Sequence, residues 1–205
     1  FVLRYSVKPS VFPVALLEAA EAMKRIRDHA AEWHVDADAI AVIGFSAGGH
    51  LAANLATSAS DDVIAAHGYD PDYVRPNGLM LSYPVITSGS LAHRDSFDAL
   101  LGEKKDDAEA LEAVSIEKHI DAKTPPVFVW HTIPDGCVPC ENALMLIDAC
   151  KKAGVSIEAH LFPEGGHGLA LGNAETAWQG VNGIEECVQV WPKLAIDWMH
   201  RTFAK

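Results

Sequence analysis

Short apolar runs alternate with amphipathic stretches along most of the chain. Runs of about four to eight largely apolar residues, bounded by Gly, Pro, Asp or Ser, are typical of buried strands. They occur at residues 1–7, 40–45, 78–83, 127–131 and 156–162. Amphipathic helical spacing between several of these runs gives a strand–helix alternation. This order predicts an α/β fold with a mostly parallel sheet and helices on both of its faces.

Helical periodicity is clearest near the two ends of the chain. From Val14 to His34, apolar residues recur at steps of three and four, which predicts a helix with one buried face. A second helix is predicted over 141–153, with Gly154 as its stop. After a Gly- and Asn-containing connection over 172–183, a closing helix is predicted over 187–203, and its inner side would carry Trp191, Leu194, Ala195, Trp198 and Met199.

Two segments lack a clear strand pattern. Residues 61–76 are polar and read as irregular, whereas residues 86–120 contain a charged stretch and a short helical run over 108–113. We interpret 86–120 as an excursion over the carboxyl edge of the sheet that could cover an active site. The alternative is a solvated surface insertion with no part in the chemistry.

The run over 40–45 leads into Gly44-Phe45-Ser46-Ala47-Gly48, a Gly-x-Ser-x-Gly pattern. A strand before it and the helix-forming residues 51–56 after it provide the context in which this pattern forms a sharp turn with Ser46 at its tip. Gly44 and Gly48 fit such a turn, because we expect that side chains at these two positions would collide with nearby backbone. Gly and Ser are common in turns, so it is the context that favours Ser46 as a nucleophile.

A serine hydroxyl is a weak nucleophile and needs a base, together with a third group that orients the base. Asp135 and His167 each lie in a Gly-containing loop directly after a predicted strand, where a parallel sheet gathers its functional loops. The order Ser46, Asp135, His167 is the chain order of α/β-hydrolase triads. We therefore predict these residues as nucleophile, acid and base, the alternative for His167 being a solvated loop histidine.

Other histidines and the cysteines are given no catalytic role. His131 is expected to hydrogen-bond inside the acid loop and His50 to pack on the helix after the turn, while surface positions on helices are expected for His29, His34 and His200. Cys137 and Cys140 have the C-x-x-C spacing of redox and zinc sites, but no second Cys/His pair of matching spacing completes a zinc site. We predict neither a metal nor a cofactor.

Size and charge narrow the classes of function. The 205 residues suit a single domain, and 49% hydrophobic with 21% charged residues is ordinary globular composition. The net charge of −12 argues against nucleic acid and anionic membranes as partners, so we expect a small or neutral ligand. The 4 cysteines are too few for a dense disulfide framework, and a reducing, cytoplasmic compartment is the simpler expectation.

Three motifs resemble those of the esterase/lipase branch of the α/β-hydrolase superfamily, and within it the acetyl-xylan-esterase-like (BD-FAE-type) carbohydrate esterases. They are Gly44 to Ala52, Trp130-His131-Thr132-x-x-Asp135-x-x-Val138-Pro139, and Phe162-Pro163-x-Gly165-x-His167-Gly168-Leu169. The resemblance extends from residue 1 to the last helix. It implies Ser46, His167 and Asp135 as the catalytic residues, no cofactor, and short acyl esters as substrates.

The sequence departs from this family in one respect. Before the strand that matches Phe1–Val7, members of the family carry further strands and a His-Gly-Gly loop, whose backbone N–H groups form half of the oxyanion hole. The 205 residues contain no His-Gly-Gly sequence. We therefore expect an N-terminally incomplete α/β-hydrolase domain in which the N–H of Ala47 supplies the remaining half. The uncovered apolar edge would favour a homo-oligomer.

The sequence thus predicts a serine carboxylesterase that acts on small acyl esters, acetylated sugars among them. Two other functions stay open: a peptidase or formamidase of the same fold, and a catalytically inactive binding domain that retains the triad.

Overall fold

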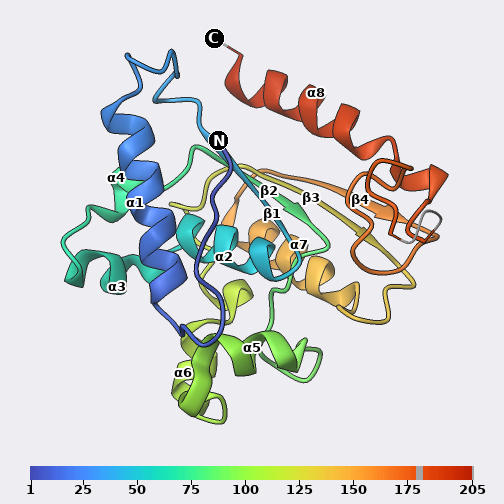
Figure 1. Ribbon diagram of the computed structural model, residues 1–205, viewed down its shortest axis with the longest axis horizontal. Helices are drawn as coiled ribbons and strands as arrows, with labels where there is room; N and C mark the ends of the chain where they lie inside the picture. The colour runs from blue at the N-terminus through green and yellow to red at the C-terminus, as the bar shows by residue number, and fades with distance from the viewer. Residues whose placement is uncertain (179–181, 205) are drawn as a thin grey trace.

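A parallel sheet forms the centre of the computed structural model, which describes residues 1–178 and 182–204 (Figure 1). Within these residues the sheet contains β1 (Ala41–Phe45), β2 (Gly78–Ser82), β3 (Val127–Thr132) and β4 (Ile157–Phe162), paired in that order. All three pairings are parallel, as the sequence predicts. The carboxyl ends of the strands therefore lie along one edge, where the loops that follow them can meet.

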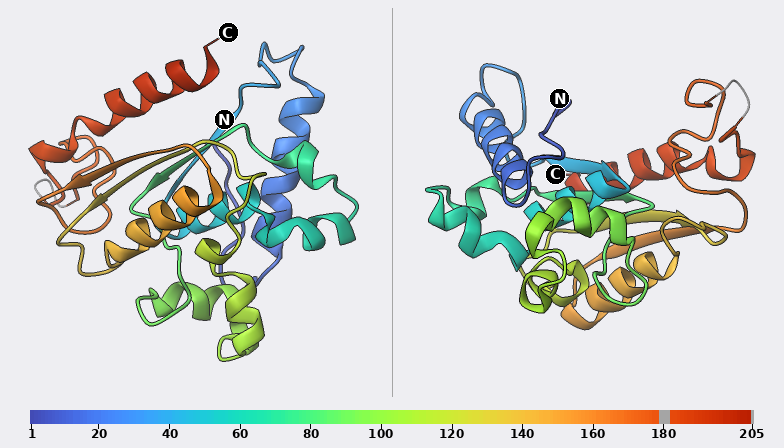
Figure 2. Two further views of the ribbon diagram at one scale, coloured as in Figure 1. Left: turned by 180° about the vertical axis from the view of Figure 1, so that it is seen from behind. Right: turned by 60° about the horizontal axis from the view of Figure 1, so that its bottom comes forward.

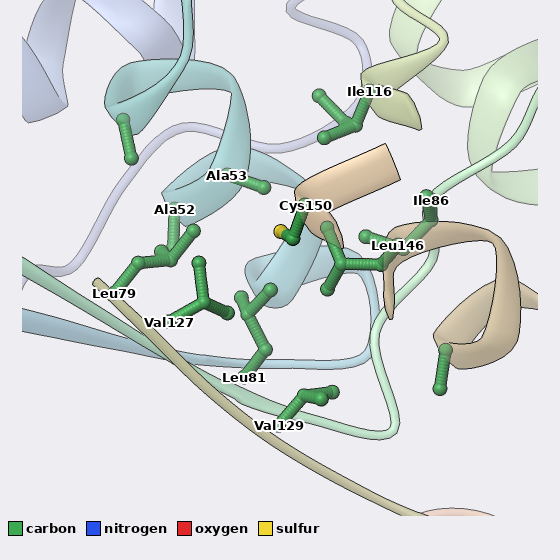
Figure 3. Close-up of a cluster of buried hydrophobic side chains, with 12 residues drawn as sticks. Ala52, Ala53, Leu79, Leu81, Ile86, Ile116, Val127, Val129, Leu146 and Cys150 are labelled. Atoms are coloured by element: carbon green, nitrogen blue, oxygen red, sulfur yellow. The ribbon is translucent and has the colours of Figure 1, made fainter. Parts of the chain in front are cut away.

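Neighbouring residues of the inner strands face two different helical layers, because side chains alternate across a strand. On one face, α2 (Ala47–Ala56) and α7 (Glu141–Ala153) bury strand side chains in a cluster that includes Leu79, Leu81, Val127 and Val129 (Figure 3). On the other face, α8 (Trp191–Phe203) covers Met80, Phe128 and Trp130. Figure 2 shows the sheet enclosed between these layers, as predicted.

The remaining helices flank this central unit. Helix α1 (Val14–Asp28) packs beside α2 near β1 through Leu16, Ala19, Ala20 and Met23. Four shorter helices follow along the chain: α3 (Asp61–Ala66), α4 (Pro71–Val74), α5 (Arg94–Leu101) and α6 (Ala108–Ala113). Single 3₁₀ turns lie at Ser58–Ser60, Gly102–Lys104, Ile116–Lys118 and Glu186–Val188.

The predicted strand at residues 1–7 is wrong. The segment carries no strand pairing and lies against α1 instead, where the backbone N–H and the hydroxyl of Ser6 both donate to the Glu18 carboxylate at 2.6 Å. A β-branched and aromatic run becomes a strand only where another strand offers its backbone groups. In the described sheet β1 is consequently an edge strand, with Ile43 44% and Phe45 36% exposed.

Several other boundaries differ from the prediction. The first helix ends at Asp28 rather than His34, which adopts a positive φ of 56° in a turn. Residues 61–76 are not irregular, because α3 and α4 form there, and the Asp70 carboxylate caps α4 by accepting from the Asp72 N–H. The closing helix begins at Trp191 rather than Cys187, with Pro192 in its first turn, a favoured position for proline.

Other predicted elements are confirmed. Helix α7 spans the predicted 141–153, and Gly154 ends it in a left-handed conformation. The predicted segment 86–120 forms no strand and contains the expected helix α6, along with α5, which was not expected. Within the predicted connection over 172–183, residues 179–181 lie outside the described part of the chain. None of the described helices combines the length and apolar character that crossing a membrane requires.

The sheet core gives a direct test of packing. Leu81 of β2 is fully buried against α2 and α7. Leu81→Ala should therefore lower the free energy of unfolding by about 2–5 kcal/mol. Leu144→Ala on the outer side of α7, where the side chain is 47% exposed, is the matched control and should cost less than about 1 kcal/mol. Urea unfolding of both variants measures the difference. Equal losses would contradict the described packing of α7.

Candidate active site

Ser46 lies at the turn between β1 and α2 in a conformation that few non-glycine residues adopt. Its φ is 53° and its ψ −120°. The Ser46 N–H donates to the Ser82 carbonyl at 3.0 Å, and the Ser46 carbonyl accepts from the Val85 N–H at 3.2 Å. Strained backbone persists only where the surroundings hold it, and here the end of β2 and its following loop do so. The turn projects Ser46 at the carboxyl edge of the sheet.

Close backbone packing explains one of the two expected glycines. A Cβ on Gly44 would lie 2.3 Å from the Gly48 carbonyl oxygen, so β1 and α2 meet too closely for any side chain there. The expectation for Gly48 is wrong: its Cβ would meet only the Tyr5 hydroxyl, at 3.4 Å. The second close approach is at Gly49, whose Cβ would lie 2.9 Å from the Cβ of Pro84.

The three predicted residues meet in one chain of hydrogen bonds. Ser46 Oγ lies 2.7 Å from His167 Nε2, and His167 Nδ1 lies 2.7 Å from Asp135 Oδ2. A carboxylate can only accept, so Nδ1 carries the ring proton and donates to Asp135. In the neutral ring, Nε2 is then free to accept the hydroxyl proton of Ser46. This is the arrangement in which a serine loses its proton to a histidine.

Asp135 is buried and surrounded by donors. The backbone N–H groups of Cys137 and Val138 donate to Oδ1 at 2.9 and 3.0 Å. Burial by itself raises the pKa of this carboxyl, but the hydrogen bonds from His131, His167 and the two backbone groups outweigh it and hold the pKa well below its usual range. Asp135 is therefore ionised wherever the protein is folded near neutral pH.

His131 is a second histidine that donates to Asp135. Sequence reasoning did not anticipate this contact. It is fully buried, and its Nε2 lies 2.9 Å from the Val138 carbonyl oxygen and 3.2 Å from Asp135 Oδ2. Both neighbours are acceptors, so Nε2 carries a proton that the two share. Its Nδ1 is buried with no partner, which fits a neutral ring with this nitrogen unprotonated. The predicted hydrogen bond between His131 and the acid loop is confirmed. The position of His131 directly before that loop was the feature of the sequence that indicated it.

The histidine loop is held by Tyr83 and Trp191, whose contacts with it sequence reasoning did not predict. The Ala170 N–H donates to the Tyr83 hydroxyl at 3.1 Å, and the Trp191 indole N–H donates to the Ala170 carbonyl at 2.7 Å. The Tyr83 ring also meets the His167 ring edge-on, with centroids 4.9 Å apart. These contacts fix where the loop carries His167. In the sequence, Tyr83 stands at the end of a predicted strand and Trp191 on the inner side of the predicted closing helix, but neither position indicated a contact with this loop.

Ala47 is the first residue of α2, directly after Ser46. The N–H groups of a first helical turn have no acceptor within the helix and lie at the positive end of its dipole. The predicted oxyanion donor is thus placed at a helix N-terminus, a position that favours a developing negative charge.

The other histidines lie as expected, with one exception. His50 is buried on α2 and hydrogen-bonds the Val114 carbonyl through Nε2 at 2.8 Å, and burial lowers its pKa. His29 and His200 are exposed at helix ends, whereas His34 is exposed in a turn beyond α1.

The cysteines are free thiols in the structure. Cys137 is exposed and Cys140 is buried. Partial loss of solvent around each sulfur raises the pKa of both thiols. Elsewhere among the described residues, one group could offer ligands to a metal: Glu164, Glu185 and Cys187, whose ligand atoms lie within 4.8 Å of one another. Proximity alone does not make a metal site, so we assign this group no function.

Comparison with known proteins places the chain among esterase-like α/β-hydrolases. The family model described as BD-FAE matches residues 3–149. A solved structure, the acetyl ester-xyloside bifunctional hydrolase from Caldicellulosiruptor lactoaceticus, is 38% identical with a TM-score of 0.82, covering 98% of this chain and 70% of its own. This similarity confirms the predicted α/β-hydrolase fold.

Two curated relatives match over most of the chain. Endo-1,4-beta-xylanase B of Butyrivibrio fibrisolvens is 37% identical over 80% of this chain, and the Acetylxylan esterase of Xylanibacter ruminicola is 27% identical over 84% of it. The matched region spans 26% and 34% of these two proteins, so the chain corresponds to only part of each of them.

The packing of the Ser46 turn can be tested at Gly44. Gly44→Ala places a methyl group against the Gly48 backbone and should lower the free energy of unfolding by more than about 2 kcal/mol. Gly136→Ala is the control, because a Cβ there meets nothing within 4 Å, and its effect should stay within about 1 kcal/mol. Chemical unfolding compares the two variants. A Gly44→Ala protein as stable as the control would refute the close approach.

Asp135 predicts how stability depends on pH. Its folded pKa is depressed, so the unfolded chain takes up the proton first as the pH falls. The stabilisation from the ionised carboxylate is therefore complete near neutral pH and is lost below about pH 5. Asp135→Asn should cost more free energy of unfolding at pH 7 than at pH 3, as measured by urea unfolding at both values. The same cost at both would contradict the depressed pKa.

Proposed function

Because the chain belongs to the BD-FAE family of esterase-like α/β-hydrolases, we propose that it is a serine carboxylesterase that hydrolyses short-chain acyl esters of small substrates, acetylated sugars among them. One observation carries the proposal: the unbroken hydrogen-bond chain from Ser46 through His167 to the buried carboxylate of Asp135. A serine in such an arrangement is activated as a nucleophile towards a carbonyl carbon.

Each step of the reaction is assigned to a group of this chain. His167 Nε2 takes the hydroxyl proton as Ser46 Oγ attacks the ester carbonyl, and the carbonyl oxygen becomes an oxyanion that accepts from the Ala47 N–H. The imidazolium then gives its proton to the leaving alcohol, which leaves an acyl group on Ser46. Water then attacks this acyl-enzyme while His167 takes one of its protons. The imidazolium returns that proton to Ser46 Oγ as the acid is released.

The surroundings of Asp135 support its part in this cycle. His167 becomes positively charged when it takes the proton, and an ionised Asp135 at 2.7 Å stabilises that charge. The donors on Asp135, among them His131 and the Cys137 N–H, keep the carboxylate ionised and fix its direction. The acid therefore holds the ring in the tautomer that leaves Nε2 free to accept.

The substrate class rests on the relatives and on charge. The names of two of them refer to acetyl esters and acetylxylan, and we extend this chemistry to the present chain. A net charge of −12 disfavours anionic substrates, whereas an acetylated sugar is neutral. The same groups could attack an amide, so ester and amide substrates have to be compared directly.

Hydrolysis of p-nitrophenyl acetate tests the proposal. Ser46→Ala should lower kcat/KM by at least about 10³-fold, and Asp135→Asn by about 10⁴-fold if the uncatalysed background allows it to be measured. Ser156→Ala, an exposed serine before β4, is the matched control and should hydrolyse the ester at the unmodified rate. Circular dichroism confirms that each variant is folded.

Three results would refute the proposal. Hydrolysis that survives Ser46→Ala would show that another group attacks the ester. Faster cleavage of aminoacyl p-nitroanilides than of the acetate would identify a peptidase. A folded protein that neither hydrolyses the ester nor reacts with a fluorophosphonate would be a binding domain.

A further inference from the structure

Asn142 is a fully buried polar residue in the first turn of α7. Its Oδ1 accepts from the backbone N–H groups of Ile86 and Thr87 at 2.9 and 3.1 Å. Its Nδ2 donates to the carbonyl oxygens of Pro139 and Leu91 at 3.0 and 3.1 Å. These four hydrogen bonds are the full capacity of an asparagine amide. The side chain therefore joins two stretches of backbone that are distant in the sequence.

One of these stretches is the chain that leaves β2. The Val85 N–H donates to the Ser46 carbonyl at 3.2 Å, and the N–H groups of the next two residues, Ile86 and Thr87, are those that donate to Asn142. Both residues are buried, and a buried N–H group needs an acceptor. Figure 3 shows Ile86 on this stretch, next to α7. Asn142 thus fixes the chain directly beside the residue that holds the Ser46 turn.

The other stretch is the loop that carries Asp135. The Val138 N–H donates to Asp135 Oδ1 at 3.0 Å, and the Val138 carbonyl accepts from His131 Nε2 at 2.9 Å. Pro139 comes next, and its carbonyl accepts from the backbone N–H of Asn142 at 2.9 Å as well as from the side-chain amide. Asn142 thus also fixes the chain directly beside the residue that holds Asp135.

We propose that Asn142 is a positioning residue that keeps Ser46 and Asp135 at the separation that His167 must bridge. The inference rests on the proposed function and adds a residue that acts on the triad only through the backbone of other residues. Ser46 and Asp135 lie at the two ends of the hydrogen-bond chain, and each is 2.7 Å from a nitrogen of His167. A shift of one end against the other lengthens at least one of these two bonds, and a displacement of about 1 Å can cost about 10²-fold in rate.

Apolar packing gives the same two stretches a second connection. The side chains of Val85 and Val138 are buried in one cluster, so the stretches stay together when the amide is lost. Packing of this kind is non-directional, whereas hydrogen bonds fix orientation. We therefore expect that removal of the Asn142 amide weakens catalysis without abolishing it.

Asn142→Ala tests the proposal in the hydrolysis of p-nitrophenyl acetate. It should lower kcat/KM by at least about tenfold, because it frees both stretches from α7. The matched control is Leu79→Ala, which removes a fully buried side chain at the amino end of β2, on the opposite side of the core cluster from Ile86 (Figure 3). The control loses core packing but should keep kcat/KM within about twofold. Both are assayed below their thermal unfolding transitions.

Proton NMR separates positioning from a loss of stability. The His167 ring proton that donates to Asp135 should give a far-downfield signal, because the bond to the carboxylate is short, and its absence from His167→Gln identifies it. Asn142→Ala should shift or broaden this signal, whereas Leu79→Ala should leave it unchanged. A residue that only stabilises the fold would leave it unchanged as well.

A second variant covers the case in which Asn142→Ala does not fold. Asn142→Asp has the same size and keeps acceptors for the Ile86 and Thr87 N–H groups, but a carboxylate cannot donate to the Pro139 carbonyl. It should therefore also lower kcat/KM and shift the His167 signal.

The outcomes distinguish this proposal from the proposed function. A folded Asn142 variant with unchanged kcat/KM and an unchanged His167 signal would overturn the positioning role and leave the esterase intact. If the unmodified chain hydrolyses no ester, the proposed function fails, and the NMR comparison alone decides whether Asn142 positions the triad.

Discussion

The contact between β1 and α2 at Gly44 and Gly48 is the constraint on which the candidate site depends. A side chain at Gly44 would overlap the Gly48 carbonyl, so the chain can reverse within the few residues between them only if position 44 has no Cβ. That reversal forces Ser46 into its positive-φ conformation and brings the N-terminus of α2 beside its side chain. One tight junction thus positions the proposed nucleophile and the proposed oxyanion donor together.

The parallel sheet brings the other two residues of the triad, Asp135 and His167, to Ser46. Since β1, β3 and β4 all run in the same direction, the loops after them reach the same edge, and residues separated by 121 positions come within 2.7 Å. Local contacts then refine the geometry: Tyr83 and Trp191 hold the loop of His167, while His131 and two backbone N–H groups hold Asp135. The sheet gives the approximate position and these hydrogen bonds give the orientation.

Features with strong local causes could be predicted from the sequence. Periodicity and turn chemistry predict the strand ending at Phe45 and the helix over 141–153, which Gly154 stops. Chain order, and the place of each loop after a strand, predict that Ser46, Asp135 and His167 converge. Features that depend on distant partners could not. Residues 1–7 have strand composition but no neighbouring strand, and the roles of Tyr83 and His131 in orienting the triad depend on which loops approach them.

Helix α5 lies outside the sheet but is connected to the candidate site through buried side chains. Its Phe97 and Leu101 are buried in one cluster with Val85 and Val138. The Val85 N–H donates to the Ser46 carbonyl, and the Val138 N–H donates to the Asp135 carboxylate. A change in the packing of α5 would therefore reach two residues of the triad at once, through the backbone groups that hold them.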